Sequence, residues 1–98
     1  MELYVIRRPS GWRTPEELQA AAARSGHVGD EQMSEDIRWI RSYVVREADG
    51  GLGTFCIYQA SSEAKIREHA ARADIPATDV FPVAETVLVR PDPVAVAA

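Results

Sequence analysis

Four side chains of this sequence are suited to chemistry, namely His69, Cys56, Tyr43 and Tyr58. Imidazole binds first-row transition metals and titrates near neutral pH. A thiolate favours soft or borderline metals, and a phenol offers an oxygen to a metal or to a ligand. These residue types therefore allow either a transition-metal site or a binding pocket in which the histidine acts as a general base.

Each of these side chains also has an ordinary structural explanation. A histidine at the border of a helix stripe, such as His69, is often a half-buried hydrogen-bonding residue. A strand cysteine such as Cys56 is by default a small buried residue, and strand tyrosines pack against neighbours across the sheet. His27 lies near an expected helix end without a companion at ligand spacing, so we interpret it as a surface residue.

Composition narrows the function classes. The 98 residues fit one domain, and the net charge of −4 comes from interspersed acidic and basic residues, so we expect no nucleic-acid partner. No segment approaches the roughly 20 apolar residues of a membrane span, and the chain starts without a leader pattern, so we expect a cytoplasmic protein. The lone Cys56 excludes an internal disulfide. Absence of CxxC, HExxH, a phosphate-binding glycine loop and a nucleophile elbow disfavours hydrolases and nucleotide-binding proteins.

A predicted β-hairpin positions most of the candidate residues. Residues 37–46 and 54–59 are rich in β-branched and aromatic side chains, and the segment 47–53 has the composition of a turn. We place a two-residue turn at Asp49-Gly50, a typical hairpin dipeptide.

That turn fixes which strand residues share a face. It sets Val44 opposite Phe55 and Tyr43 opposite Cys56. One face, which we place beneath helices, then carries Ile40, Val44, Phe55 and Ile57. The other carries Trp39, Arg41, Tyr43, Val45, Thr54, Cys56 and Tyr58. A register shifted by one residue would scatter these polar and aromatic groups over both faces, so we favour the first.

The remaining elements have clear local signals. Residues 2–8 alternate as a strand, and Thr14-Pro15-Glu16-Glu17 starts a helix with a capping box, which we expect to break near Gly26. A second helix runs from a cap at Ser61 or Ser62 to about Ala73, and residues 80–89 alternate as a last strand.

The order strand, helix, strand, strand, helix, strand predicts a ferredoxin-like α+β fold, βαββαβ, with a four-stranded antiparallel sheet. Residues 1–90 form this domain, and residues 91–98 form a flexible C-terminal tail. Both helices cover one face of such a sheet, so the other face needs a cover. We expect a homodimer, assembled as a dimeric α/β barrel, that buries the face bearing Trp39, Tyr43 and Tyr58.

Three ordered motifs resemble a small bacterial family of unknown function. They are Trp39-x-x-Ser42-Tyr43-Val44, then Cys56-x-Tyr58-x-Ala60, then Ile66-Arg67-Glu68-His69-Ala70-x-Arg72-Ala73-x-x-Pro76. The characterised member type of that family is a nickel-binding protein with a ferredoxin-like fold and a dimeric barrel. The resemblance extends through Val83. Asp74 departs from it, because a glycine usually follows the helix there, and the turn at 49–53 is longer than usual.

The resemblance implies a nickel-binding homodimer, with His69 as principal ligand and with Cys56 and Tyr43 as secondary candidates. Water, carboxylate, backbone or a partner subunit must complete such a site. The alternative is an enzyme or small-molecule binding protein with an aromatic cavity lined by Trp39, Tyr43 and Tyr58 beside His69. A third possibility is an interaction module whose aromatic face is only a dimer interface.

Overall fold

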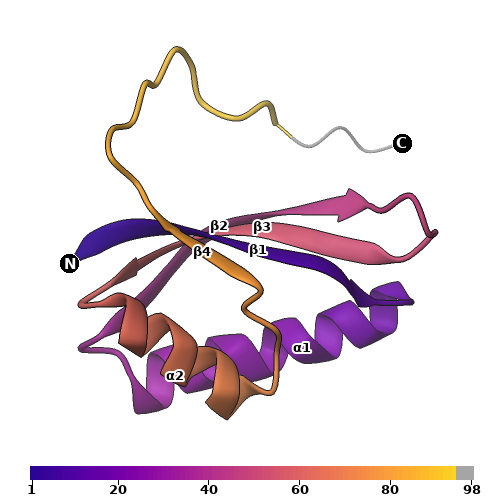
Figure 1. The fold of residues 1–98 in the computed structure, drawn as a ribbon, viewed down its shortest axis with the longest axis horizontal. Coiled ribbons are helices and arrows are strands. Elements are labelled where there is room, and N and C mark those ends of the chain that lie inside the picture. The colour runs from indigo at the N-terminus through magenta and orange to yellow at the C-terminus, as the bar shows by residue number, and fades with distance from the viewer. Residues whose placement is uncertain (95–98) are drawn as a thin grey trace.

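The computed structural model describes residues 1–94, which form one sheet with two helices on one side (Figure 1). The strands are β1 (Glu2–Trp12), β2 (Ile37–Arg46), β3 (Leu52–Ala60) and β4 (Asp79–Pro82). The helices are α1 (Pro15–His27) and α2 (Glu63–Ala73), and a turn of π-helix, η1 (Val28–Gln32), continues α1. The predicted α+β class and element order βαββαβ are confirmed.

Helix starts follow their local signals. Thr14 Oγ1 accepts a hydrogen bond from Glu17 N at 3.2 Å, and the Glu17 carboxylate accepts one from Arg13 N at 2.8 Å. Ser62 caps α2 by accepting from Lys65 N. Asp74 ends α2 in the left-handed conformation, with φ of 55°, in the place where glycine is the usual residue.

The expected break at Gly26 does not occur. Helix α1 passes through Gly26 and continues into η1, where Val28 and Gly29 are buried. A Cβ atom on Gly29 would lie 3.7 Å from Ile37 and 3.8 Å from His69 Nε2, so the helix runs close to β2 and α2. Tertiary packing thus outweighs the weak helix propensity of two glycines.

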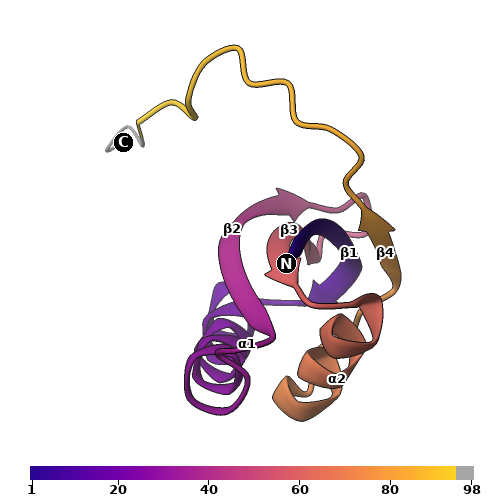
Figure 2. The same ribbon diagram turned by 90° about the vertical axis from the view of Figure 1, so that its left-hand side faces the viewer.

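The strand order is β2-β3-β1-β4, and every neighbouring pair is antiparallel. Seen along the strands, both helices lie below the sheet and the C-terminal segment lies above it (Figure 2). In the part of the chain that the structure describes, no helix is long and apolar enough to cross a membrane.

The predicted hairpin register is wrong by one residue. Tyr43 lies opposite Phe55, and Ser42 lies opposite Cys56. Glu47 N bonds to Gly51 O, so the loop holds three residues, 48–50, and Gly50 adopts a positive φ of 87°. A three-residue loop with a left-handed glycine shifts the pairing by one residue relative to a two-residue turn.

A β-bulge at Ile40 also changes which residues of β2 share a face of the sheet. The register shifts between Trp39 and Arg41, which leaves Ile40 without a partner. Trp39 therefore shares a face with Cys56 and Tyr58 but not with Tyr43. That face, which also carries Tyr4 and Ile6 of β1, is the helix-covered one, so the prediction that it lies away from the helices is wrong.

The opposite face, called the open face below, carries Tyr43, Phe55, Ile57 and Phe81. Phe55 and Ile57 had been predicted beneath the helices, whereas Phe55 is 40 % exposed and pairs with Tyr43. Ile40 and Val44, predicted there too, are exposed, although Val44 pairs with Thr54 and so lies on the helix-covered side as predicted. Arg7 covers part of Phe55, with its guanidinium carbon 4.5 Å from the ring centre.

The last strand is shorter than predicted, because β4 ends at Pro82 instead of Val89. Residues 83–94 leave the sheet and arc over the open face (Figure 1). Asp92 anchors this segment by accepting hydrogen bonds from Tyr43 Oη at 2.8 Å and Arg41 at 2.9 Å. Part of the predicted tail, residues 95–98, lies outside the described residues.

Candidate functional site

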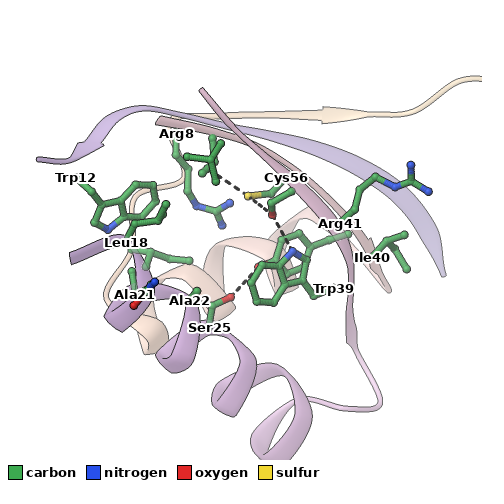
Figure 3. Close-up of a pocket in the computed structure, with 16 residues that line it drawn as sticks. Arg8, Trp12, Leu18, Ala21, Ala22, Ser25, Trp39, Ile40, Arg41 and Cys56 are labelled. Carbon is green, nitrogen blue, oxygen red and sulfur yellow. Dashed lines mark hydrogen bonds between the residues drawn. The ribbon is translucent and has the colours of Figure 1, made fainter. Parts of the chain in front are cut away.

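A cavity of about 500 Å³ lies between α1 and strands β2 and β3, on the helix-covered side of the sheet (Figure 3). We call it the α1–β2 cavity. Its apolar walls come from Trp12, Leu18, Ala21, Ala22, Trp39 and Val44. Its polar lining includes Arg8, Ser25, Ser42, Thr54, Cys56 and Tyr58. A cavity of this size with a few converging polar groups is typical of a small-molecule site.

Arg8 is the most unusual residue of the cavity. It is only 1 % exposed, and it donates its Nε–H to the carbonyl oxygen of Pro76. Its Nη2 is buried and has no hydrogen-bond partner among the described residues. Buried guanidinium groups are normally paired, because removing a charge from water without compensation is costly.

A chain of hydrogen bonds runs along the sheet side of the cavity. Trp39 Nε1 donates to Ser42 Oγ at 2.8 Å, and Ser42 Oγ donates to Cys56 Sγ at 2.9 Å. The Cys56 thiol donates to Thr54 Oγ1 at 3.2 Å. An indole N–H can only donate, so it sets the direction of the whole chain.

Tyr58 on β3 lines the cavity from the side of the sheet. Its ring stacks on Trp39 with centroids 6.0 Å apart and planes inclined by 3°, and its hydroxyl is 2.7 Å from Ser25 Oγ. Burial raises the pKa of Tyr58 to about 12, so the phenol is neutral at physiological pH.

His69 joins the two helices. Its Nε2 lies 3.0 Å from the carbonyl oxygen of Ser25, and because a carbonyl only accepts, Nε2 carries a proton. Burial lowers the pKa of His69, and the charge of Arg8 adds to this effect. The ring contacts Tyr58 at a centroid distance of 5.3 Å but does not line the cavity.

The structure brings some of the predicted site residues together and separates others. Trp39, Cys56 and Tyr58 all line the α1–β2 cavity. Tyr43 is on the open face, where it bonds to Asp92, so it is on the other side of the sheet from Cys56. Among residues 1–94, no three His, Cys, Asp or Glu side chains are grouped in a way that could hold a metal ion.

Sequence reasoning missed Arg8, Ser25 and Thr54. One signal was present for Arg8, because it shares the period-two alternation of Tyr4 and Ile6 and so falls on an inward position of β1. A charged residue at an inward strand position is a candidate functional group. Ser25 and Thr54 gave no comparable signal, since small hydroxyl residues are common on helices and strands.

Comparison with known proteins gives one family. The family model described as "Nickel responsive protein SCO4226-like" matches residues 4–83. A solved structure, the crystal structure of SCO4226 from Streptomyces coelicolor A3(2), superposes with a TM-score of 0.70. The match has 14 % sequence identity and covers 87 % of this chain and 99 % of that one, so it concerns the fold alone. No curated protein matches the sequence.

Proposed function

We propose that this chain, which belongs to the nickel responsive SCO4226-like family, binds nickel or another first-row transition metal as a homodimer. The observation that carries the proposal is the family match over residues 4–83, which spans nearly all of the folded domain.

His69 is the proposed principal ligand. Burial lowers the pKa of His69, so the imidazole is neutral near pH 7 and metal does not have to displace a proton. Nε2 is engaged with the carbonyl oxygen of Ser25, which leaves the lone pair of Nδ1 for a metal. A metal at Nδ1 would therefore keep the contact between the two helices intact.

Cys56 and Tyr43 are proposed as secondary ligands, and they lie on opposite faces of the sheet. They cannot both join His69 at one ion within a single chain. Since residues 1–94 contain no group of three candidate ligands, water, backbone or a second copy would supply the other donors.

Dimerisation is proposed through the open face, which carries Tyr43 of the predicted interface but not Trp39 and Tyr58, because these two lie on the helix-covered side. Tyr43, Phe55 and Phe81 are each at least 40 % exposed there, and the segment above them exposes Val87, Leu88 and Val89. An exposed sheet face with several large apolar side chains is typical of an interface, and a self-complementary patch is buried most simply by two-fold symmetry.

Nickel titration by calorimetry tests this function. We expect heat of binding in the wild type, a lower affinity in His69→Ala, and wild-type affinity in His27→Ala, which removes an exposed histidine. Circular dichroism checks that each variant is folded. Absence of heat in the wild type would rule out nickel binding, and equal affinity in all three proteins would remove His69 as a ligand.

A second candidate function is the binding of a small molecule, and the α1–β2 cavity favours it. Trp39 and Tyr58 line this cavity, whereas His69 and Tyr43 do not. The cavity therefore supports binding without a histidine base. Saturable changes in tryptophan fluorescence on adding small amphipathic compounds would test it.

A further inference from the structure

The guanidinium of Arg8 has no negative partner in the described part of the chain. None of the ion pairs between the described residues includes Arg8, and no acidic side chain lines the α1–β2 cavity. The other cation of the lining, Arg41, is paired with Asp92 at 2.9 Å. Arg8 is thus the one uncompensated charge of the cavity, and arginine stays protonated at any physiological pH.

The neighbours of Arg8 satisfy only part of its hydrogen-bonding capacity. The Pro76 carbonyl oxygen accepts from Nε, and the Tyr58 ring lies 5.7 Å from the guanidinium carbon. Neither neighbour brings a formal negative charge, because Tyr58 remains a neutral phenol. Nη2 is left without an acceptor, and Figure 3 shows the Arg8 side chain reaching from β1 toward the cavity.

Thr54 supplies a second donor beside Arg8. The two residues pair directly between β1 and β3, and Thr54 is buried. The hydrogen-bond chain from Trp39 ends at Thr54 Oγ1, which accepts from the Cys56 thiol and keeps its own hydroxyl proton to donate. A guanidinium and a hydroxyl thus present donors at one end of the cavity.

The hydroxyl and thiol groups of Ser25, Ser42, Cys56 and Tyr58 are bonded within the protein, and the remaining walls are mainly two tryptophans and the small side chains of α1. We propose that the α1–β2 cavity binds a small amphipathic monocarboxylate, with its carboxylate against Arg8 and Thr54 and its apolar body against Trp12, Leu18 and Trp39. A single unpaired cation matches a single negative charge, and a guanidinium matches the planar carboxylate. This inference rests on the second candidate function and specifies its ligand class.

Access to the cavity is between α1 and β2. Trp39 and Val44 on the outer strand β2 are exposed, whereas Thr54 on β3 and Arg8 on β1, which follow Val44 inward across the sheet, are buried. A ligand would therefore enter with its charged head first and leave its apolar body near the opening. Ligands with a charged group at both ends should bind poorly.

Intrinsic fluorescence gives a direct test, because the chain contains only two tryptophans and both line the cavity. The probes are phenylacetate, its neutral analogue phenylacetamide, and octanoate as an acid with an aliphatic body. We expect the wild type to bind phenylacetate at least about tenfold more tightly than the amide, which corresponds to one charge-assisted hydrogen-bond pair.

Two variants locate the carboxylate. Arg8→Met should abolish the preference for acid over amide, and Thr54→Val should reduce it, because a hydroxyl donates a stronger hydrogen bond to a carboxylate than to an amide oxygen. Arg38→Met, which removes an exposed arginine of β2 outside the cavity, is the matched control and should keep the preference. If Arg8→Met does not fold, Thr54→Val and Arg8→Lys test the same prediction, since each should weaken the preference for acid over amide; circular dichroism checks that each variant is folded.

These measurements test the binding cavity and its selectivity for carboxylates separately. Equal binding of acid and amide to the wild type, or a preference that persists in Arg8→Met, would overturn the carboxylate inference but keep the cavity as a binding site. No response to either acid at concentrations on the order of 10 mM would overturn both, because even a weak site is filled there.

Discussion

His69 in α2 donates its Nε2–H to the backbone oxygen of Ser25 in α1, across 3.0 Å in the protein interior. The hydroxyl of the same serine lies 2.7 Å from Tyr58 Oη on β3. Ser25 therefore connects both helices to the sheet. The stability of the fold should depend on this junction more than on any of its surface ion pairs, since exposed pairs contribute little.

Stability should depend on pH through His69. Its pKa in the folded protein is below the ordinary 6.5, so between these two values the unfolded chain binds the proton and the folded chain does not. The contribution of His69 to the free energy of unfolding therefore falls as pH decreases below about 6.5 and is constant above it. Urea unfolding between about pH 5.5 and about pH 7.5 measures this slope.

His69→Gln keeps a hydrogen-bond donor but cannot titrate, so the slope should become much smaller in this variant. His27→Gln removes an exposed histidine and should keep the wild-type slope. Equal slopes in all three proteins would show that His69 is not the group responsible.

Tyr58→Phe should destabilise the protein by about 1–3 kcal/mol, because it leaves Ser25 Oγ buried without its partner. The stacking on Trp39 is retained in this variant. Ser25→Ala in the Tyr58→Phe background should recover part of the loss, since no buried hydroxyl then lacks a partner. Tyr43→Phe, which removes an exposed hydroxyl, should change the unfolding free energy little; a loss as large as that of Tyr58→Phe would contradict this account.

Two glycine substitutions should have opposite effects. Gly50→Ala should cost about 1–2 kcal/mol, because φ of 87° is unfavourable for any residue with a Cβ atom. Gly26→Ala should stabilise by up to about 1 kcal/mol, since nothing lies within 4 Å of the added Cβ and the position is helical. Thermal unfolding of the two variants side by side measures the difference, and the same sign of change in both would refute it.

Phe55→Glu should separate the proposed dimer. It places a charge at the centre of the open face, opposite Tyr43. Sedimentation should give about twice the 10.8 kDa chain mass for the wild type and the monomer mass for the variant. Ala20→Glu, on the exposed side of α1, is the control and should remain a dimer. A monomeric wild type at micromolar concentration would exclude this assembly.

The sequence predicted the elements well where the signals are local. The capping box at Thr14, the cap at Ser62 and the order of strands and helices all depend on a few neighbouring residues. The register of the hairpin depends on whether its loop has two or three residues. The composition of residues 47–53 is compatible with both lengths. Asp49 and Gly50 lie in the loop as predicted. Ala48 also belongs to it, so the loop has three residues and not two.

The bulge explains why Trp39 and Tyr43 do not share a face, contrary to the prediction. Side chains alternate between the two faces on each side of Ile40 as predicted. Because Ile40 is an extra residue, Trp39 and Arg41 lie on opposite faces instead of on the same one. Trp39, Thr54, Cys56 and Tyr58 are correctly grouped on one face, yet the helices cover that face. The cavity and its unpaired arginine could not be derived, because they depend on how far α1 lies from the sheet.

The outer strands of the sheet have a further consequence for assembly. Strand β2 ends the sheet on one side, and there the bulge and the exposed side chains of Arg38 and Arg46 oppose pairing with a strand from another molecule. Strand β4 ends it on the other side with four residues, including Pro82, which has no N–H to donate. Lateral growth into a continuous intermolecular sheet is disfavoured at both margins, so the apolar open face can be displayed without leading to fibrous aggregation.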